Sequence, residues 1–238
     1  MAKERLDKLI ASTGRWSRRE VKTLVREGRV LVDGRIAGSA EEKYDAESCR
    51  IAVNGEELLL RRHTYVMLHK PAGVLSATED GRGRTVLDLL TPELRKIGVF
   101  PVGRLDKDTE GLLLLTDDGE LAHALLSPKK HVDKVYYARV SGRLTPEDCA
   151  VFEAGMTLGD GLECLPAGLE ILAAGETSEC LVTLREGKFH QVKRMLAARG
   201  KPVTYLKRLS MGSLRLDDTL APGEFRLLTA AEEAQLQR

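Results

Sequence analysis

The chain has 238 residues, of which 42% are hydrophobic and 31% are charged, and its formal net charge is +1. This balance excludes wholesale disorder and leaves room for one large domain and one small domain. Apolar runs such as Leu112 to Leu115 are far too short to span a bilayer, and the N-terminal segment lacks the apolar core of a secretory signal. The sequence therefore predicts a cytoplasmic protein with no membrane partner.

The four cysteines give no sign of a metal site or of a disulfide framework. They form no C-x-x-C pair, and none has a histidine nearby at zinc-binding spacing. We expect reduced thiols and no bound metal.

Basic residues are concentrated in two segments of this nearly neutral chain. Residues 1–35 contain ten Lys and Arg against five Asp and Glu, and residues 185–215 contain nine against the single acid Glu186. Solvated surface charge would explain either segment alone. Two such segments together predict two surfaces that face a polyanion.

Two short helices are predicted near the N-terminus. Apolar residues at helical spacing predict a first helix over residues 5–13. Ser17 is a candidate N-cap for a second helix, and Glu20 three residues later completes a capping box. This second helix is expected to end near Gly28.

The second helix carries a row of like charges. Arg18, Lys22 and Arg26 recur every four residues, with Arg15 and Arg19 beside them. Repulsion between like charges at this spacing lowers helix stability by a few tenths of a kcal/mol for each pair. A basic row that persists despite this cost is suited to binding a row of phosphates. We predict that these five residues face the phosphates of a polyanion.

Residues 1–60 are predicted to form one small domain. After the two helices, residues 29–36 and 50–55 each combine a strand with an Asp-Gly or Asn-Gly turn. The segments R-L-D-K-L-I, S-R-R-E-V and G-R-V-L-V-D-G together resemble an S4-type RNA-binding domain, a family that presents its second helix to RNA. A small helical cap with a charged exterior is the alternative.

Residues 61–238 read as a second, larger domain with short strands and helices in no strict alternation. This order favours an α+β fold over a doubly wound sheet. Strands are expected at 65–68, 112–115, 134–140, 168–172, 180–184, 206–209 and 213–216, and helices at 85–90, 119–127, from 145, at 190–199 and after Thr229.

An acidic turn at residues 103–111 is the strongest chemical signal in the chain. Asp106, Asp108 and Glu110 match the opening of a calcium loop, with Asp117 at its twelfth position. A β-run precedes these acids, however, and four leucines replace the second half of such a loop. Aspartates beside glycine and threonine commonly stabilise a tight, solvent-exposed turn, which accounts for the presence of Asp108 and Asp117. This leaves Asp106 as a candidate nucleophile or general base.

The same stretch resembles the signature of a known family. The pattern G-R-L-D-x-x-T-x-G-L-L-L-L-T-x-D-G (103–119) is similar to that of RNA pseudouridine synthases, in particular the ribosomal branch with an N-terminal S4 domain. Further matches follow in family order at 67–74, 127–136, 184–195 and 220–229. The resemblance implies a mixed, mainly antiparallel sheet in residues 61–238 and makes Asp106 the catalytic residue.

The resemblance also implies partners for Asp106. A carboxylate in a dry site needs a cation to keep it ionised, and the H-Q-V-K-R segment supplies Lys193, with Arg194 on phosphate. The two could be exchanged, because adjacent helical residues point about 100° apart. Tyr136 would stack on the target base, while strand alternation sends Tyr137 to the opposite face.

The remaining RNA contacts are expected around these groups. Arg104 would hold the phosphate beside the flipped base. The rest of the predicted RNA-binding set comprises Gly103, Leu105, His190 and Gln191.

The implied activity is isomerisation of uridine to pseudouridine in ribosomal RNA, or in a ribosomal subunit assembly intermediate, by a monomer. The reaction has no net redox change and consumes no external group, so no cofactor is expected. The closing segments R-L-S-M-G-S-L-R-L-D and P-G-E-F-R lean toward enzymes of small-subunit 16S RNA. A 23S enzyme and a non-catalytic S4-type binding or ribosome-assembly protein are the alternatives.

Overall fold

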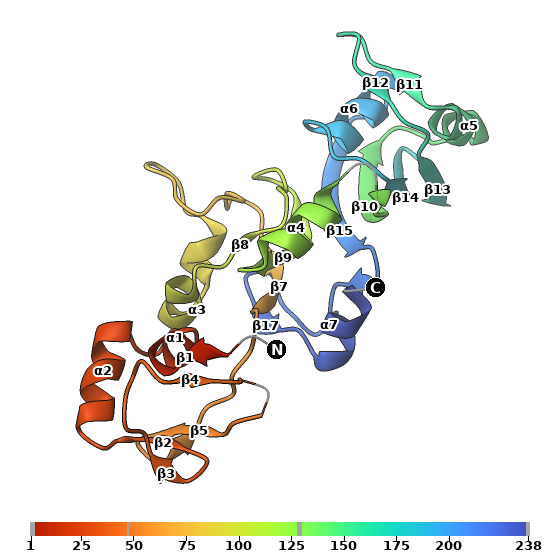
Figure 1. The fold of residues 1–238 in the computed structure, drawn as a ribbon. Helices are drawn as coiled ribbons and strands as arrows, with labels where there is room; N and C mark the ends of the chain where they lie inside the picture. The colour runs from red at the N-terminus through yellow and green to blue at the C-terminus, as the bar shows by residue number, and fades with distance from the viewer. Residues whose placement is uncertain (1–2, 47, 128–129, 237–238) are drawn as a thin grey trace. The chain divides into compact units, whose positions relative to one another are not determined.

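The computed structural model describes residues 3–46, 48–127 and 130–236, and the chain divides into two compact units (Figure 1). Unit 1 contains Met1–Thr64, Leu90–Val99 and Thr116–Asp118, and unit 2 contains the rest. Residues 90–99 thus pack with the N-terminal unit, although the boundary predicted at residue 60 assigns them to the second domain. Pro128 and Lys129, part of the segment at 127–136 that resembles the family, lie outside the described residues.

Unit 1 combines two helices with a small antiparallel sheet. Its helices are α1 (Leu6–Ala11) and α2 (Arg18–Arg26), and β1 (Glu4–Arg5) pairs with β4 (Lys43–Tyr44). Within the described residues, a four-stranded sheet has the order β3 (Arg35–Ile36), β2 (Val30–Val32), β5 (Ile51–Val53) and β6 (Glu56–Glu57). The two hairpin signatures, Asp33-Gly34 and Asn54-Gly55, join the strands as predicted.

The capping box expected at the start of α2 is present. Ser17 Oγ accepts a hydrogen bond from Glu20 N at 3.2 Å, and Ser17 N donates to Glu20 Oε2 at 2.6 Å. These bonds satisfy backbone groups that a helix terminus otherwise leaves unpaired. They fix the start of α2 and thereby the face that this helix turns toward the core.

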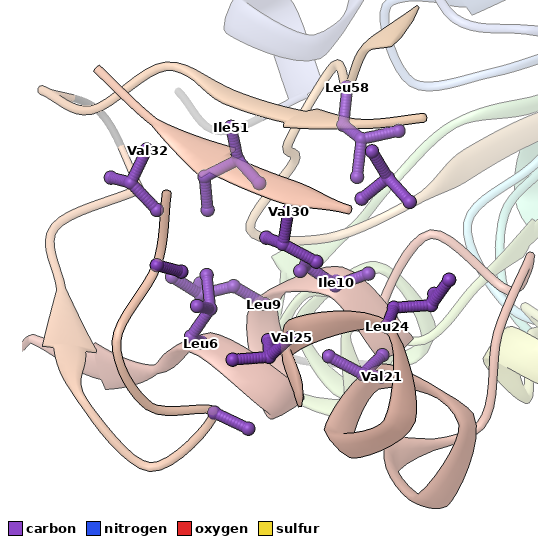
Figure 2. Packing of buried hydrophobic residues seen from close by; sticks show 13 residues of the cluster. Leu6, Leu9, Ile10, Val21, Leu24, Val25, Val30, Val32, Ile51 and Leu58 are labelled. Carbon is purple, nitrogen blue, oxygen red and sulfur yellow. The ribbon is translucent and has the colours of Figure 1, made fainter. Parts of the chain in front are cut away.

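The core of unit 1 lies between the helices and the sheet, as Figure 2 shows. Each helix contributes one apolar stripe, and alternate strand residues meet it. Complete burial of such a side chain contributes roughly 1.5–3 kcal/mol. The core includes Leu6, Leu9, Ile10, Val21, Leu24, Val25, Val30, Val32, Ile51 and Leu58.

Helix α3 (Pro92–Ile97) packs closely against the turn between α1 and α2. Thr91 caps its N-terminus, with Thr91 Oγ1 accepting from Leu94 N at 3.4 Å. Gly14 in the turn has φ +72°, and a Cβ atom there would lie 2.2 Å from the carbonyl oxygen of Glu93. Only glycine permits this approach.

Unit 2 is built on a mixed, mainly antiparallel sheet. Within the described residues its main path runs β13 (Gly168–Ala173), β14 (Thr177–Leu184), β10 (Lys134–Ser141), β15 (Val203–Met211), β9 (Glu110–Thr116), β7 (Tyr65–Lys70) and β17 (Phe225–Leu227). Off this path, β8 (Phe100–Pro101) pairs with β9 and β16 (Leu214–Arg215) with β15, while β11 (Met156–Thr157) and β12 (Glu163–Cys164) form a separate hairpin. Outside this sheet lie η1 (Val86–Leu89), α4 (Gly119–Leu126), α5 (Pro146–Ala154), α6 (Gln191–Ala198) and α7 (Ala230–Leu236).

Strand β9 positions the acidic loop that precedes it. Its four leucines, Leu112 to Leu115, are fully buried, and β9 runs parallel to β15. Arg208 Nε donates to the carbonyl of Leu112 at 2.8 Å, while Gly111 has φ +105° and a Cβ there would lie 2.2 Å from the carbonyl oxygen of Arg208. Glycine thus allows the two strands to meet directly after the loop.

Most predicted elements are present. The helix expected at 85–90 is a 3₁₀ helix at Val86–Leu89. Short strands that were not expected include β11, β12 and β17, and β17 pairs with β7. In the described part of the chain, no helix has the length and apolarity needed to cross a membrane.

Candidate active site

The loop between β8 and β9 presents Asp106 at the edge of a cleft in unit 2. Ser76 Oγ donates to the carbonyl of Leu105 at 2.9 Å and accepts from Leu105 N at 3.0 Å, which fixes the residue just before the acid. The Asp106 side chain is 25% exposed. A carboxylate anchored in this way keeps its direction while one edge stays open to a ligand.

Lys70 lies beneath this loop and is fully buried. Its Nζ donates to the carbonyl oxygens of Thr109 at 2.8 Å, Pro71 at 2.9 Å and Lys107 at 3.2 Å. Burial lowers the pKa of Lys70 to about 8, against the opposing charges of the carboxylates in the loop. The bonds to Lys107 and Thr109 hold the loop to the end of β7, and the bond to Pro71 fixes the turn that follows this strand.

Lys193 on α6 supplies the cation beside Asp106. Its Nζ lies 2.9 Å from Asp106 Oδ2 and 2.5 Å from Asp108 Oδ1. Burial would lower the Lys193 pKa, but the hydrogen bonds and charges of Asp108 and Asp106 outweigh it and raise that pKa. The hydrogen bond from Lys193 in turn lowers the pKa of Asp108. Asp108 was expected to serve only the turn, and this contact corrects that interpretation.

His190 begins α6 in a left-handed conformation, with φ +51°. This backbone region is uncommon for a residue with a side chain, and such outliers cluster at functional sites. The turn brings His190 Nε2 to 3.6 Å from Asp106 Oδ1, beyond hydrogen-bond distance. A small adjustment of either side chain would join them.

Gln191 fixes the turn before α6 and also lines the cleft. Its side chain is buried; Oε1 accepts from Lys188 N at 3.0 Å and Nε2 donates to Glu186 Oε1 at 2.5 Å. Both ends of its amide thus hold the turn before α6, and a contact of Gln191 with RNA stays a prediction.

Asp106 and Tyr136 line the same cavity, with a volume of about 60 Å³. Tyr136 faces it from β10, whereas Tyr137 contacts Tyr205 on the other face of the sheet. This volume is well below the ~300–1,000 Å³ of typical ligand pockets. The lining also includes Arg104, Leu105, Thr109, Lys188, His190, Gln191 and Leu206.

Comparisons with known proteins show the family of this chain. A family model described as RNA pseudouridylate synthase matches residues 64–198, and an S4 domain model matches residues 4–48. The chain belongs to the RNA pseudouridine synthase family.

Relatives of the synthase match it over nearly their whole length. An uncharacterized RNA pseudouridine synthase of Bacillus subtilis is 50% identical over 229 residues, covering 96% of each chain. Ribosomal small subunit pseudouridine synthase A of Vibrio cholerae is 40% identical, covering 98% of this chain and 99% of the relative. Ribosomal large subunit pseudouridine synthase B of Bacillus subtilis is 39% identical, covering 98% and 96% respectively.

A solved structure described as a pseudouridylate synthase is also similar. It has a TM-score of 0.68 and 35% sequence identity, and the match covers 98% of this chain and 99% of that one. The N-terminal S4 domain followed by a synthase domain is therefore the architecture of this enzyme.

Of the other predicted residues of the synthase domain, some lie at the Asp106 cavity and Arg194 lies away from it. Arg104 is exposed at the rim of the Asp106 cavity, and Leu105 is buried in its wall. Gly103, half-buried just before them, has no side chain to offer. Arg194 turns away from Asp106, and its Nη2 lies 2.5 Å from Asp160 Oδ1.

The predicted basic row of the S4 domain is partly neutralised. Arg18 Nη2 lies 3.1 Å from both carboxylate oxygens of Asp7, which is fully buried and also bound by Arg5. Burial alone would raise the Asp7 pKa, but its bonds to Arg5 and Arg18 lower it overall. Arg18 therefore has a structural role in addition to any contact with RNA.

Two more members of the row form ion pairs. Lys22 Nζ lies 3.0 Å from Glu41 Oε1, and Arg15 Nη2 lies 2.6 Å from Glu56 Oε2. The last two members of the row, Arg19 and Arg26, have exposed side chains. Neither forms an ion pair with another described residue.

The calcium alternative does not fit the observed backbone. The seven residues of β9 separate Asp108 from Asp117, and an extended strand of that length spans roughly 23 Å. Asp117 Oδ1 instead accepts a hydrogen bond from Thr64 N at 2.7 Å. Over residues 3–46, 48–127 and 130–236, no cluster of three or more His, Cys, Asp or Glu could hold a metal ion.

Three residues that support the site were not singled out from the sequence: Lys70, Ser76 and, as a partner of Lys193, Asp108. Lys70 did carry a signal, because it ends a strand in which all six residues are buried. A lysine in such a run needs several acceptors. Two of its three acceptors, the carbonyls of Lys107 and Thr109, lie more than thirty residues away, so no local pattern reveals them.

Proposed function

We propose that this enzyme isomerises a specific uridine of small-subunit 16S ribosomal RNA, with Asp106 as the catalytic carboxylate. The ion pair of Asp106 with Lys193 at the edge of the Tyr136 cavity is the observation that carries the proposal. Lys193 Nζ, 2.9 Å from Asp106 Oδ2, places a positive charge directly beside the carboxylate.

The chemistry divides among three side chains. The N1–C1′ bond of uridine breaks, the base turns, a C5–C1′ bond forms, and the C5 proton leaves while N1 gains one. Asp106 would add to the sugar or base, or remove a proton from the sugar. Tyr136 would stack on the extruded base, and Arg104 at the rim would hold the adjoining phosphate.

Ribosomal RNA is the substrate class supported by the S4 domain and by the names of the relatives. Those names include enzymes of both ribosomal subunits. The sequence identities of 40% and 39% are too similar to favour one subunit over the other. The leaning toward 16S RNA rests on the closing segments at 208–217 and 222–226. We further propose that a monomer acts in the cytoplasm, on free RNA or on a subunit assembly intermediate.

The test is a map of pseudouridine in both ribosomal RNAs. Transcripts of 16S and 23S RNA, and the corresponding subunit precursors, are incubated with the wild-type protein, and pseudouridine is located by chemical labelling and primer extension. One labelled position in 16S RNA is expected. A position in 23S RNA alone would overturn the subunit assignment, and none on any substrate would favour the non-catalytic binding protein.

A further inference from the structure

Phe189 is an exposed aromatic side chain directly beside the catalytic cavity. It is 75% exposed and is the one aromatic among the large exposed hydrophobic residues of the described chain. Burying such a ring normally stabilises a protein, so a free ring beside a nucleotide site is suited to a ligand. The steps proposed for Asp106 and Tyr136 do not use it.

One face of the Phe189 ring is covered by His190. The ring centroids are 3.8 Å apart and the rings are inclined by 18°, which is a stacked arrangement. His190 also lines the cavity of Asp106. The two rings therefore form a short stack that begins at the catalytic cavity and ends at the exposed face of Phe189.

A second hollow lies along the outer side of α6. Its volume is about 460 Å³, and Phe189 contributes to its lining together with Leu158, Asp160, Arg194 and Ala197. This volume is within the range of small-molecule sites, unlike the narrow cavity at Asp106. Arg194, paired with Asp160 at 2.5 Å, places a guanidinium group in the same hollow as the ring.

We propose that this hollow is a second nucleotide subsite, in which an unpaired nucleotide near the target uridine stacks on the exposed face of Phe189. Only an unpaired nucleotide can present the face of its base to an aromatic ring. Arg194 would exchange its contact with Asp160 for a phosphate of this nucleotide. Stacking of this kind tolerates any base, so the subsite selects unpaired RNA rather than a sequence.

The subsite rests on the proposed function, because it takes RNA in the cleft as its starting point. It explains how the enzyme would hold a strand open while uridine enters the narrow cavity. A base on Phe189 would extend the His190 stack and keep the neighbouring nucleotide from restacking on the target.

The test uses Phe189→Ala, Phe189→Leu and Phe189→Trp in the full-length protein. The probe is a nine-nucleotide RNA with a central uridine between two 2-aminopurines, whose fluorescence falls when the base stacks. The Ala and Leu variants should raise Kd about 5- to 150-fold and lose the quenching. The Trp variant should keep the wild-type Kd and the quenching. This result would separate the effect of stacking from that of a large apolar side chain.

Leu172→Ala is the matched control, since Leu172 is 49% exposed on β13 and does not line the hollow. It should leave Kd unchanged. Unchanged binding and quenching in the Ala and Leu variants would overturn the subsite, as would an equal loss in the control. Pseudouridine formation by the wild type is measured in parallel, so a failure of the proposed function is seen separately from a failure of the probe to stack.

Discussion

Lys70 and Lys193 place two cations around the loop that carries Asp106, and they hold it in different ways. Lys193 contacts the carboxylates of Asp106 and Asp108, whereas Lys70 bonds only to backbone carbonyls. The backbone bonds fix the path of the loop whichever side chains it carries. The pair with Lys193 then fixes the direction of the acid.

The depressed pKa of Lys70 predicts a specific pH dependence of stability. Its folded pKa of about 8 lies below the value of roughly 10.4 for an unfolded chain, so between these pH values the unfolded state binds more protons. The unfolding free energy of the wild type should therefore rise relative to Lys70→Met across this window, by on the order of 3 kcal/mol. Urea unfolding at pH 7 to 10.5 measures the difference, and parallel curves for the two proteins would contradict the burial of a charged Lys70.

At the scale of elements, α2 is both a structural helix and a candidate RNA surface. Arg18 must stay paired, because its loss would leave the buried Asp7 with one fewer partner. Arg19 and Arg26 are exposed, and no ion pair involves them within the described chain. These two side chains are therefore the cleanest probes of the row.

Charge reversal of Arg19 and Arg26 together should weaken RNA binding and reduce its salt dependence. Each lost contact with single-stranded RNA lowers the slope of log K against log salt by about 0.7, so two contacts lower it by about 1.4. The matched control reverses Arg35 and Arg50, two exposed residues outside the row. Equal effects in both double variants would mean that RNA responds to net charge rather than to α2.

The contact of α3 with the Gly14 turn makes a second prediction for unit 1. Alanine at Gly14 is strained by its positive φ and would also place Cβ 2.2 Å from the carbonyl oxygen of Glu93. Gly34 has a similar φ of +77° but no atom within 4 Å of a Cβ. Gly34→Ala should cost about 1 kcal/mol, and Gly14→Ala should cost at least about 1 kcal/mol more. Thermal unfolding compares them, and equal losses would show that α3 does not pack there.

At the scale of the whole molecule, local patterns predicted the elements well. The Ser17 capping box, the four buried leucines of β9 and the opposite faces of Tyr136 and Tyr137 all follow from spacing within a few residues. The α+β class followed from the order of these elements.

Contacts between distant segments could not be predicted in this way. Glu41 pairs with Lys22 across 19 residues of sequence and Glu56 pairs with Arg15 across 41, and both pairs neutralise part of the basic row. The placement of Lys193 beside Asp106 came from family resemblance rather than from any rule of spacing. Tertiary packing decides such pairs, and it leaves no periodic trace in the sequence.

The central claim is that Asp106 performs the chemistry, and its neighbour Asp108 provides the control. Both carboxylates contact Lys193, but only Asp106 lines the cavity of Tyr136. Single-turnover pseudouridine formation on ribosomal RNA, with RNA affinity measured alongside, compares Asp106→Asn with Asp108→Asn. We predict no detectable product for Asp106→Asn at unchanged RNA affinity, and a rate for Asp108→Asn within about tenfold of the wild type. Product formation by Asp106→Asn at a rate near that of the wild type would contradict the assignment.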